Sequence, residues 1–286
     1  MTQRASTTEE YQKQINIIIE YINNHLHEPI DLIKLAEISN FSPYHFHRIT
    51  RAFMGEPIGA YIIRTRVETA ARLLRYTDLS ISDIAYKIGY DVPSSLSKAF
   101  QKHFGISPID YRNNKDYIIM KSTIKDLQLD IKRGKLMDIP TKKAIYIKLT
   151  GHYSSLDFSG SWMRLWQYVK EHKLFSMGME HIAIYYDDPK VTEAEKLRTD
   201  ICLVIKKDCK PQGDIGVKEI KGGKFMMFLY KGSYDHLDAV YDTIYSKLLP
   251  DNNLRLRNEQ GFEKYLNHPD KTKPEKLKTE IYIPVE

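Results

Sequence analysis

Two segments of the chain carry hydrogen-bond donors at the spacing of one helix face. The donors of the first segment are Tyr44, His47, Arg48 and Arg51. Those of the second are Ser94, Ser95, Lys98 and Gln101. Arginine can bind a guanine through two parallel hydrogen bonds, lysine offers a point charge, and serine can bond to a base or a phosphate. Contacts with double-stranded DNA are therefore one interpretation, and a solvated helix face is the other.

Each set of donors is interleaved with apolar residues that would seat the same helix on a neighbour. The apolar residues are Phe46, Ile49 and Phe53 in the first segment and Leu96, Ala99 and Phe100 in the second. A helix that enters the major groove needs such a seated face, a free face and a supporting helix before it. The pattern predicts two helix-turn-helix units, at about residues 32–54 and 81–104.

The two units repeat one sequence pattern. Leu35-Ala36 matches Ile84-Ala85 at a shift of 49, and Phe46 matches Leu96 at a shift of 50, so the extra residue falls in a turn. A longer helix at about 57–76 separates the units. Its expected apolar stripe contains Ile63, Val67, Ala70 and Leu74, and its outward residues are Arg64, Arg72 and Arg75. Two units held at a fixed distance would reach successive major-groove segments over about 20 base pairs.

Overall charge does not decide whether DNA is the partner. The net charge is +6, but residues 1–118 hold 14 Lys and Arg against 13 Asp and Glu, and residues 119–286 hold 29 against 24. Composition is that of a soluble globular protein, with 42% hydrophobic and 28% charged residues. The chain contains no apolar run near the roughly 20 residues of a membrane span, no apolar stretch at its start and only two cysteines. We expect a cytoplasmic protein with free thiols and no membrane contact.

The second half of the chain has the texture of an α+β domain with an internal repeat. Residues 144–150 alternate apolar and polar side chains, which predicts a half-buried strand. Gly151-His152-Tyr153 matches Gly232-Ser233-Tyr234 at a shift of 81, and Tyr185 matches Tyr265 at a shift of 80. Each copy is expected to run strand, helix, strand, strand. Two similar lobes that face each other usually leave a groove between them.

Glu263 is an acidic residue among aromatic residues of the second copy. It lies on a predicted strand beside Phe262, so burial of Phe262 would turn Glu263 to the opposite face, which is either the groove or water. A carboxylate in an apolar groove favours a hydrophobic cation, which neutralises the charge and stacks on rings. The candidate aromatic walls, each of which could also be plain core, are Tyr265, Trp162, Trp166, Tyr185 and Tyr230.

Residues 8–115 resemble the DNA-binding domain of the AraC/XylS family of transcription regulators. The resemblance rests on FSPYHFHRITRAFMGEPIGAYI at 41–62 and ISDIAYKIGYDVPSSLSKAFQKHFGISPIDYR at 81–112. It implies base-reading roles for Tyr44, His47 and Arg48, and for Ser94, Ser95 and Lys98. The chain departs from the family at Thr50, where an aromatic residue is common, and at Lys98, where arginine is frequent.

Residues from about 120 to 286 resemble the GyrI-like small-molecule-binding domain. The segments that carry the resemblance include Tyr185 to Pro189, Leu197 to Asp200, Gly232 to Tyr234, Phe262 to Asn267 and Thr279 to Pro284. The resemblance implies two strand-helix-strand-strand modules around a groove. It also implies a bulky, apolar, cationic ligand held by aromatic rings around the carboxylate of Glu263.

These observations predict a two-domain regulator with an all-α double helix-turn-helix domain at 8–115, a linker at 116–140 and an α+β effector domain at 141–286. We expect a transcriptional activator that binds double-stranded DNA, RNA polymerase and a small-molecule effector, without a cofactor, a metal site or an enzymatic activity. Two alternatives remain for the second domain. A hydrolase-like site would pair Glu263 with Tyr265 or Tyr230 as a general base, and an interaction module would hold a protein partner.

Overall fold

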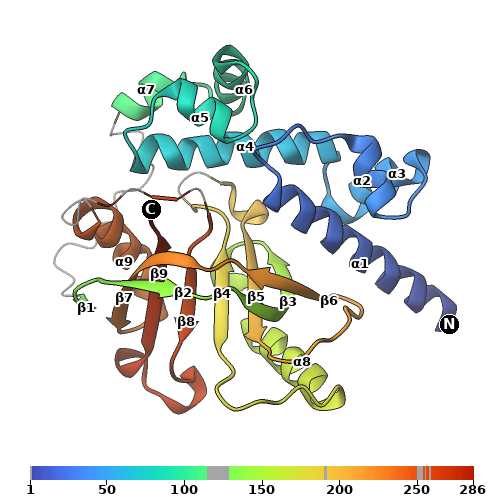
Figure 1. The fold of residues 1–286 in the computed structure, drawn as a ribbon, viewed down its shortest axis with the longest axis vertical. Coiled ribbons are helices and arrows are strands. Elements are labelled where there is room, and N and C mark those ends of the chain that lie inside the picture. The colour runs from blue at the N-terminus through green and yellow to red at the C-terminus, as the bar shows by residue number, and fades with distance from the viewer. Residues whose placement is uncertain (1, 115–128, 190–191, 250–253, 255, 258) are drawn as a thin grey trace. The chain divides into compact units, whose positions relative to one another are not determined.

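The computed structural model describes residues 2–114, 129–189, 192–249, 254, 256–257 and 259–286 (Figure 1). The side chains of residues 2–8, 43, 44 and 246 also lie outside the description. The chain divides into two compact units. The helical unit contains α1 to α7 together with residues 210–216, and the sheet unit contains the elements from β1 to β9 except the first two residues of β6. No helix in the described ranges is both long and apolar enough to cross a membrane.

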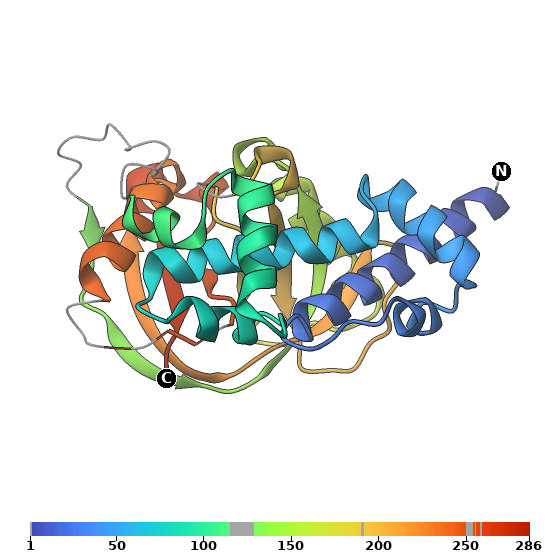
Figure 2. The same ribbon diagram turned by 90° about the horizontal axis from the view of Figure 1, so that it is seen from above.

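The helical unit contains the two expected helix-turn-helix pairs, joined by the long helix α4. In Figure 2 the chain passes from one pair to the other along α4. The helices are α1 (Thr2–Asn24), α2 (Leu32–Ile38), α3 (Pro43–Met54), α4 (Ile58–Tyr76), α5 (Ile81–Lys87), α6 (Pro93–Phe104) and α7 (Pro108–Asn113). The order of a 7-residue helix followed by a 12-residue helix occurs in α2–α3 and again in α5–α6.

Local sequence explains why the second helix of each pair has the same length and ends. Both α3 and α6 have 12 residues, begin at a proline and end at a glycine in the left-handed region, Gly55 with φ 74° and Gly105 with φ 73°. The turns also correspond, because Asn40 and Gly89 both have positive φ. A Cβ on Gly89 would lie 2.5 Å from the carbonyl oxygen of Leu26, so only glycine fits there.

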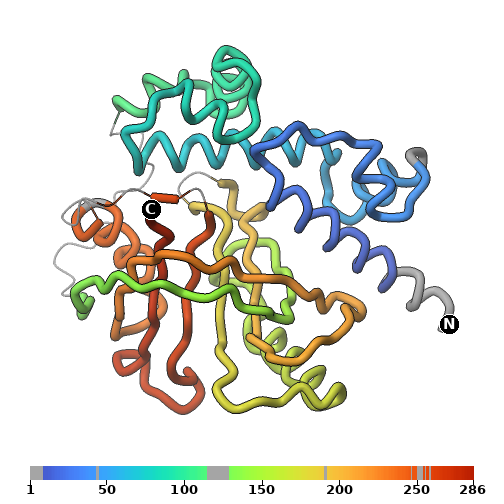
Figure 3. The backbone as a smooth tube through the Cα atoms, viewed as in Figure 1, coloured from blue at the N-terminus to red at the C-terminus, as the bar shows by residue number. Residues whose placement is uncertain are grey.

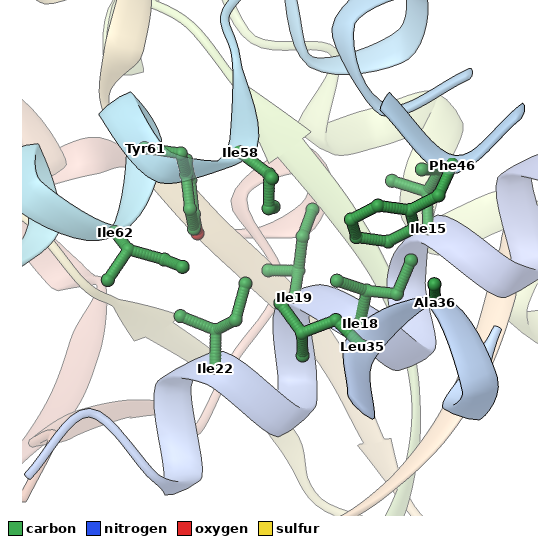
Figure 4. Close-up of a cluster of buried hydrophobic side chains, with 10 residues drawn as sticks. All are labelled: Ile15, Ile18, Ile19, Ile22, Leu35, Ala36, Phe46, Ile58, Tyr61 and Ile62. Carbon is green, nitrogen blue, oxygen red and sulfur yellow. The ribbon is translucent and has the colours of Figure 1, made fainter. Parts of the chain in front are cut away.

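The first pair is built on a hydrophobic core that four helices share (Figure 4). Side chains from α1, α2, α3 and α4 point toward one another in the close-up, and their burial provides the hydrophobic stabilisation of this end of the unit. The buried members are Ile15, Ile18, Ile19, Ile22, Leu35, Ala36, Phe46, Ile58, Tyr61 and Ile62.

The expected faces of α4 are wrong at two neighbouring residues, Ile63 of the apolar stripe and Arg64 of the outward side. Ile63 is 51% exposed, whereas Arg64 is 6% exposed. Arg64 is buried because its guanidinium pairs with Glu56 and Glu68, which removes most of the cost of burying its charge. Helical periodicity alone cannot reveal such a pair, because it scores an arginine as a surface residue.

The sheet unit contains a nine-stranded antiparallel sheet within the described residues, and its path can be followed in Figure 3. The strand order is β1-β7-β9-β8-β4-β5-β3-β6, and β2 also pairs with β7. The strands are β1 (Asp130–Ile131), β2 (Lys135–Ile139), β3 (Lys142–Thr150), β4 (His181–Tyr185), β5 (Arg198–Val204), β6 (Ile215–Ile220), β7 (Gly223–Lys231), β8 (Phe262–Tyr265) and β9 (Lys278–Pro284).

Two helices accompany the sheet, α8 (Phe158–Glu171) after β3 and α9 (Leu237–Thr243) after β7. The chain continues from α9 into the π-helical turn Ile244–Leu248. The two segments of the unit therefore run β3–α8–β4–β5 and β7–α9–β8–β9. Short 3-10 helices at Tyr153–Ser155 and Tyr234–His236 precede α8 and α9 at corresponding points.

Two details differ from the sequence analysis. Residues 130–131 and 135–139, expected within the linker, form β1 and β2, because their backbones pair with β7. The linker residues 116–128 lie outside the described part of the chain. The strand at 144–150 is not half-buried, since Ala144, Ile145, Tyr146 and Ile147 are all buried. Both faces of the sheet carry hydrophobic clusters, so the alternation of side chains does not separate core from water here.

Candidate functional site

The predicted DNA-contacting residues lie on the exposed sides of α3 and α6. On α3, His47, Arg48 and Arg51 are exposed, and the side chain of Tyr44 lies outside the described residues. On α6 all four predicted residues are exposed, namely Ser94, Ser95, Lys98 and Gln101. The side-chain amide of Gln101 donates a hydrogen bond to the carbonyl oxygen of Gly105 at 2.8 Å, which closes the end of α6.

The buried faces of α3 and α6 make different packing contacts. Phe46 and Leu96 are fully buried at matching positions. Thr50, where the resemblance leads one to expect an aromatic ring, is buried and donates to the carbonyl oxygen of Phe46 at 2.8 Å. Its counterpart Phe100 instead packs against Phe104 and Tyr111, with ring centroids 4.6 and 5.3 Å away. The two helices are therefore similar in what they expose and different in what holds them.

Glu263 is buried in the middle of the sheet and is 1% exposed. On β8 it is paired with Ile281 of β9 and Ala183 of β4. Ile281 belongs to the hydrophobic cluster that includes Val240 of α9. Phe262, the preceding residue, packs with Phe225 and Tyr282 in the cluster of the opposite face. Because Glu263 itself is buried, the alternative that its side chain faces water is excluded.

One phenol group donates a hydrogen bond to Glu263, and a second lowers its pKa. The hydroxyl of Tyr265 lies 2.8 Å from Oε2 of Glu263, and Tyr241 of α9 is the second phenol that favours the ionised carboxylate. Burial raises the pKa of Glu263 to about 7, and the two phenols oppose this rise because they stabilise the ionised form. Among the described residues, no cation contributes to this pKa. The carboxylate therefore titrates near neutral pH in a site that would favour an added positive charge.

Aromatic rings surround the hydrogen-bonded pair of Glu263 and Tyr265. The hydroxyls of Tyr185 and Tyr265 are 3.0 Å apart. Tyr234 approaches Tyr265 with a centroid distance of 5.4 Å, and Tyr153 approaches Tyr185 at 4.9 Å. Trp162 of α8 lies 6.4 Å from Tyr265. We call the five rings of Tyr153, Trp162, Tyr185, Tyr234 and Tyr265 the aromatic cluster.

The predicted ligand residues divide into three groups. Glu263, Tyr265, Trp162 and Tyr185 come together. Trp166 is connected to this group through His181. Its indole N–H donates to Nε2 of His181 at 3.1 Å, and the His181 ring packs on Trp162. Tyr230 is not brought to Glu263 by any described contact. It packs in the cluster beneath α9, and its hydroxyl donates to the carbonyl oxygen of Ser233.

Three tyrosines near Glu263 were not predicted. Tyr153 and Tyr234 are the last residues of the repeated Gly-x-Tyr motif, and each packs on the tyrosine of its own copy, Tyr185 or Tyr265. The repeat was therefore the signal that could have found them. Tyr241 sits in the apolar stripe of α9, where sequence cannot distinguish a core tyrosine from a donor to a buried carboxylate.

The remaining buried charges of the sheet unit are paired. Asp200 is fully buried and accepts from Lys148 at 2.8 Å and from Lys218 at 2.7 Å. These ammonium groups hold the pKa of Asp200 below its usual range against the cost of burial. In the parts of the chain that are described, no group of three or more His, Cys, Asp or Glu is arranged to hold a metal ion. Cys202 and Cys209 are free thiols, as expected.

A double helix-turn-helix unit followed by a strand-rich unit with a buried carboxylate defines a class of two-domain DNA-binding regulators with an effector domain. Residues 135–286 match the family of GyrI-like small molecule binding domains, and residues 35–114 match a helix-turn-helix domain. The chain belongs to the GyrI-like family and is an AraC-family DNA-binding transcriptional regulator.

Similar proteins match either nearly the whole chain or about a third of it. The chain is 24% identical to the Right origin-binding protein of Escherichia coli K12 over 95% of this chain and 97% of that protein. It is 33% identical to the Regulatory protein SoxS of Salmonella typhimurium over 36% of this chain and 96% of that protein. The HTH-type transcriptional regulator YbfP of Bacillus subtilis is 35% identical over 36% of this chain, which spans only 35% of that relative.

Proposed function

We propose that this regulator is an activator that reads DNA with α3 and α6 and senses a hydrophobic cation at Glu263. The domains would be residues 8–115 and 141–286, joined by 116–140. RNA polymerase would be the protein partner, and ligand binding would change DNA affinity or polymerase contact by about 1–3 kcal/mol. The corresponding order of elements in β3–α8–β4–β5 and β7–α9–β8–β9 supports a repeat with the effector between its copies.

The proposed DNA contacts divide into base readers and phosphate contacts. Arg48 would bind a base bidentately, with Tyr44 and His47 beside it, and Ser94, Ser95 and Lys98 would read the second half of the site. Arg51 would bind phosphate, and Gln101 would add a contact beside Lys98. The exposure of the described side chains among these residues supports the assignment.

The ligand proposal rests on one observation. Glu263 is buried among aromatic rings, and its described partners are phenols and not cations. A cationic ligand would supply the missing charge and stack on the rings of the aromatic cluster. A neutral analogue of the same shape would leave the carboxylate without compensation. Trp166 would support Trp162 through His181, and Tyr230 is proposed as a core residue.

We propose sensing over catalysis for the sheet unit. The names of the similar proteins, which include regulatory proteins and an origin-binding protein, support this preference. A hydrolase-like site or a protein-binding groove would give different outcomes in the ligand experiment. Turnover of the bound cation would support a hydrolase, and capture of a protein without cation affinity would support an interaction module.

The DNA proposal is tested by selecting duplexes from a random pool with the full-length protein. We expect enriched duplexes with two half-sites about one helical turn apart. Arg48→Ala should relax base preference in one half, while Arg51→Ala should weaken binding to all sequences and lower the salt dependence. Equal affinity for selected and scrambled duplexes would refute the proposal.

The ligand proposal is tested by titrating a lipophilic phosphonium cation and its neutral isosteric hydrocarbon analogue. Glu263→Gln should reduce cation affinity by about 100-fold and leave the weak affinity for the neutral analogue unchanged. Glu280→Gln is the matched control, because Glu280 lies on the adjacent strand and its partners are Lys264 and Tyr282. Equal cation affinity of wild type and Glu263→Gln would remove the carboxylate from the site. Selection with and without the cation then tests coupling.

A further inference from the structure

A buried charged cluster connects the end of α3 to α4. The Arg64 side chain, on α4, is 7% exposed. Its Nη2 lies 2.6 Å from Oε1 of Glu56, and its Nη1 lies 3.1 Å from Oε2 of Glu68, whose side chain is 5% exposed. The Nε of Arg64 also donates to Glu56 Oε1 at 3.1 Å. We call Glu56, Arg64 and Glu68 the clamp.

The clamp acts at the point where α3 ends. Gly55 closes α3 by donating from its N–H to the carbonyl oxygen of Arg51. Glu56 is the next residue, and Pro57 then begins the approach to α4. Two nitrogens of one planar guanidinium hold Glu56, so the clamp restrains direction as well as distance. Glu68, one turn beyond Arg64 on the same helix, fixes the guanidinium from the other side.

The second unit has the same turn without the clamp. The repeat places Ile106 at the position of Glu56 and Asn114 at the position of Arg64. The end of α6 is instead held by rings, because Phe104 packs between Phe100 and Tyr111 with centroid distances of 4.6 and 5.8 Å. An apolar solution to the same turn therefore exists within this chain.

This difference argues for a role beyond stability. Buried ion pairs often stabilise a fold no more than apolar residues of similar volume, whereas their hydrogen bonds fix a geometry. The clamp ties the residue that follows the end of α3 to α4, and the proposed base readers lie on the exposed side of α3. A small rotation of α3 would displace Arg48 from hydrogen-bonding distance of a base, since such bonds weaken steeply with angle.

We propose that Arg64 is a positioning residue that sets the angle at which α3 presents its donors to DNA. It determines sequence preference in the half-site that α3 reads, without contacting the DNA. This inference rests on the proposed DNA-reading role of α3.

The experiment uses the full-length protein and the best duplex from the random-pool selection. Base-pair substitutions in each half-site are scored against wild type, and the halves are assigned to α3 and α6 with Arg48→Ala and Lys98→Ala. The test variants are Arg64→Met and the milder Glu56→Gln, since the Glu56 side chain is 20% exposed. Phe104→Leu is the matched variant of the second unit.

We expect both clamp variants to lower discrimination in the α3 half-site by about tenfold and to leave the α6 half-site within about twofold of wild type. Phe104→Leu should show the reverse pattern. Equal losses of discrimination in both half-sites, together with a lowered thermal midpoint, would show that the clamp has only a structural role and would overturn the inference. The inference would also be overturned if Glu56→Gln and Arg64→Met both fold and both keep wild-type discrimination in the α3 half-site. A wild-type protein that selects no duplex would instead refute the proposed function.

Discussion

The sheet buries two carboxylates on opposite faces, and they differ in whether a cation is their partner. Ala183 of β4 is paired with Glu263, and the next residue, Ile184, is paired with Asp200. Successive strand residues point to opposite faces, so the two acids lie on different sides of the same sheet. Asp200 is held by two lysines, which keep its pKa below the usual range. Glu263 is held by phenols, and burial raises its pKa to about 7.

The difference separates a charge that is paired within the fold from one that, as we propose, is paired by a ligand. Burying an ionised group is unfavourable unless it is paired and hydrogen-bonded. Asp200 has its cations within the fold, so an added cation would gain little there. Glu263 accepts a hydrogen bond from Tyr265 but has no described cationic partner, so its ionised form is left partly uncompensated. The same chemical group therefore serves the fold on one face and, as we propose, recognition on the other.

Removal of the structural charge should have the largest effect. Asp200→Asn leaves Lys148 and Lys218 without their shared carboxylate in a buried site. We expect a loss of about 3–5 kcal/mol in the free energy of unfolding at pH 7. Denaturant unfolding followed by tryptophan fluorescence measures it, since both tryptophans of the chain, Trp162 and Trp166, lie in the sheet unit. A loss below about 1 kcal/mol would mean that the two carboxylates do not differ as described.

Removal of the charge of Glu263 should stabilise the protein, and only at higher pH. The folded pKa of Glu263 is raised from 4.5 to about 7, so folding binds its proton more tightly. Its contribution to stability is fully present below pH 4.5 and is lost as the pH rises through 7. At pH 8 the penalty approaches about 3 kcal/mol, because each pKa unit corresponds to roughly 1.4 kcal/mol.

Glu263→Gln removes this penalty. We therefore expect the variant to be more stable than wild type by up to about 3 kcal/mol at pH 8 and nearly equal to it at pH 4.5. The measurement is denaturant unfolding at the two pH values, with Glu280→Gln as the control of equal charge change. A difference that does not depend on pH would show that Glu263 is not held near neutrality. Saturating cation should raise the stability of wild type more than that of the variant.

The same contrast shows what sequence could and could not predict. The helix-turn-helix pairs follow from local periodicity, and the ends of α3 and α6 follow from proline and glycine. The Arg64–Glu68 pair of the clamp has the i,i+4 spacing of one helix face, but the pairing of Arg64 with Glu56 across the turn, and of Asp200 with its lysines, depends on contacts that no short-range pattern connects. Glu263 was found through a family resemblance, but its phenol partners depend on where α9 packs. Tyr230 and Tyr265 look alike in sequence, and only the pairing of strands separates core from site.

The smallest expected effect is that of removing the hydroxyl of Tyr265, which donates a hydrogen bond to Glu263. Tyr265→Phe removes the 2.8 Å hydrogen bond to Oε2 and keeps the ring. Burial, then less opposed, should raise the pKa of Glu263 further, so a smaller fraction is ionised at pH 7. Affinity for the lipophilic cation should fall about fivefold at pH 7 and less at pH 9, where the carboxylate is ionised in both proteins. Tyr230→Phe, which removes a hydroxyl bonded to Ser233 instead, is the control and should leave cation affinity unchanged. If the two substitutions weaken binding equally, the hydroxyl of Tyr265 does not tune the carboxylate, and the contrast between the two faces reduces to the presence or absence of lysine.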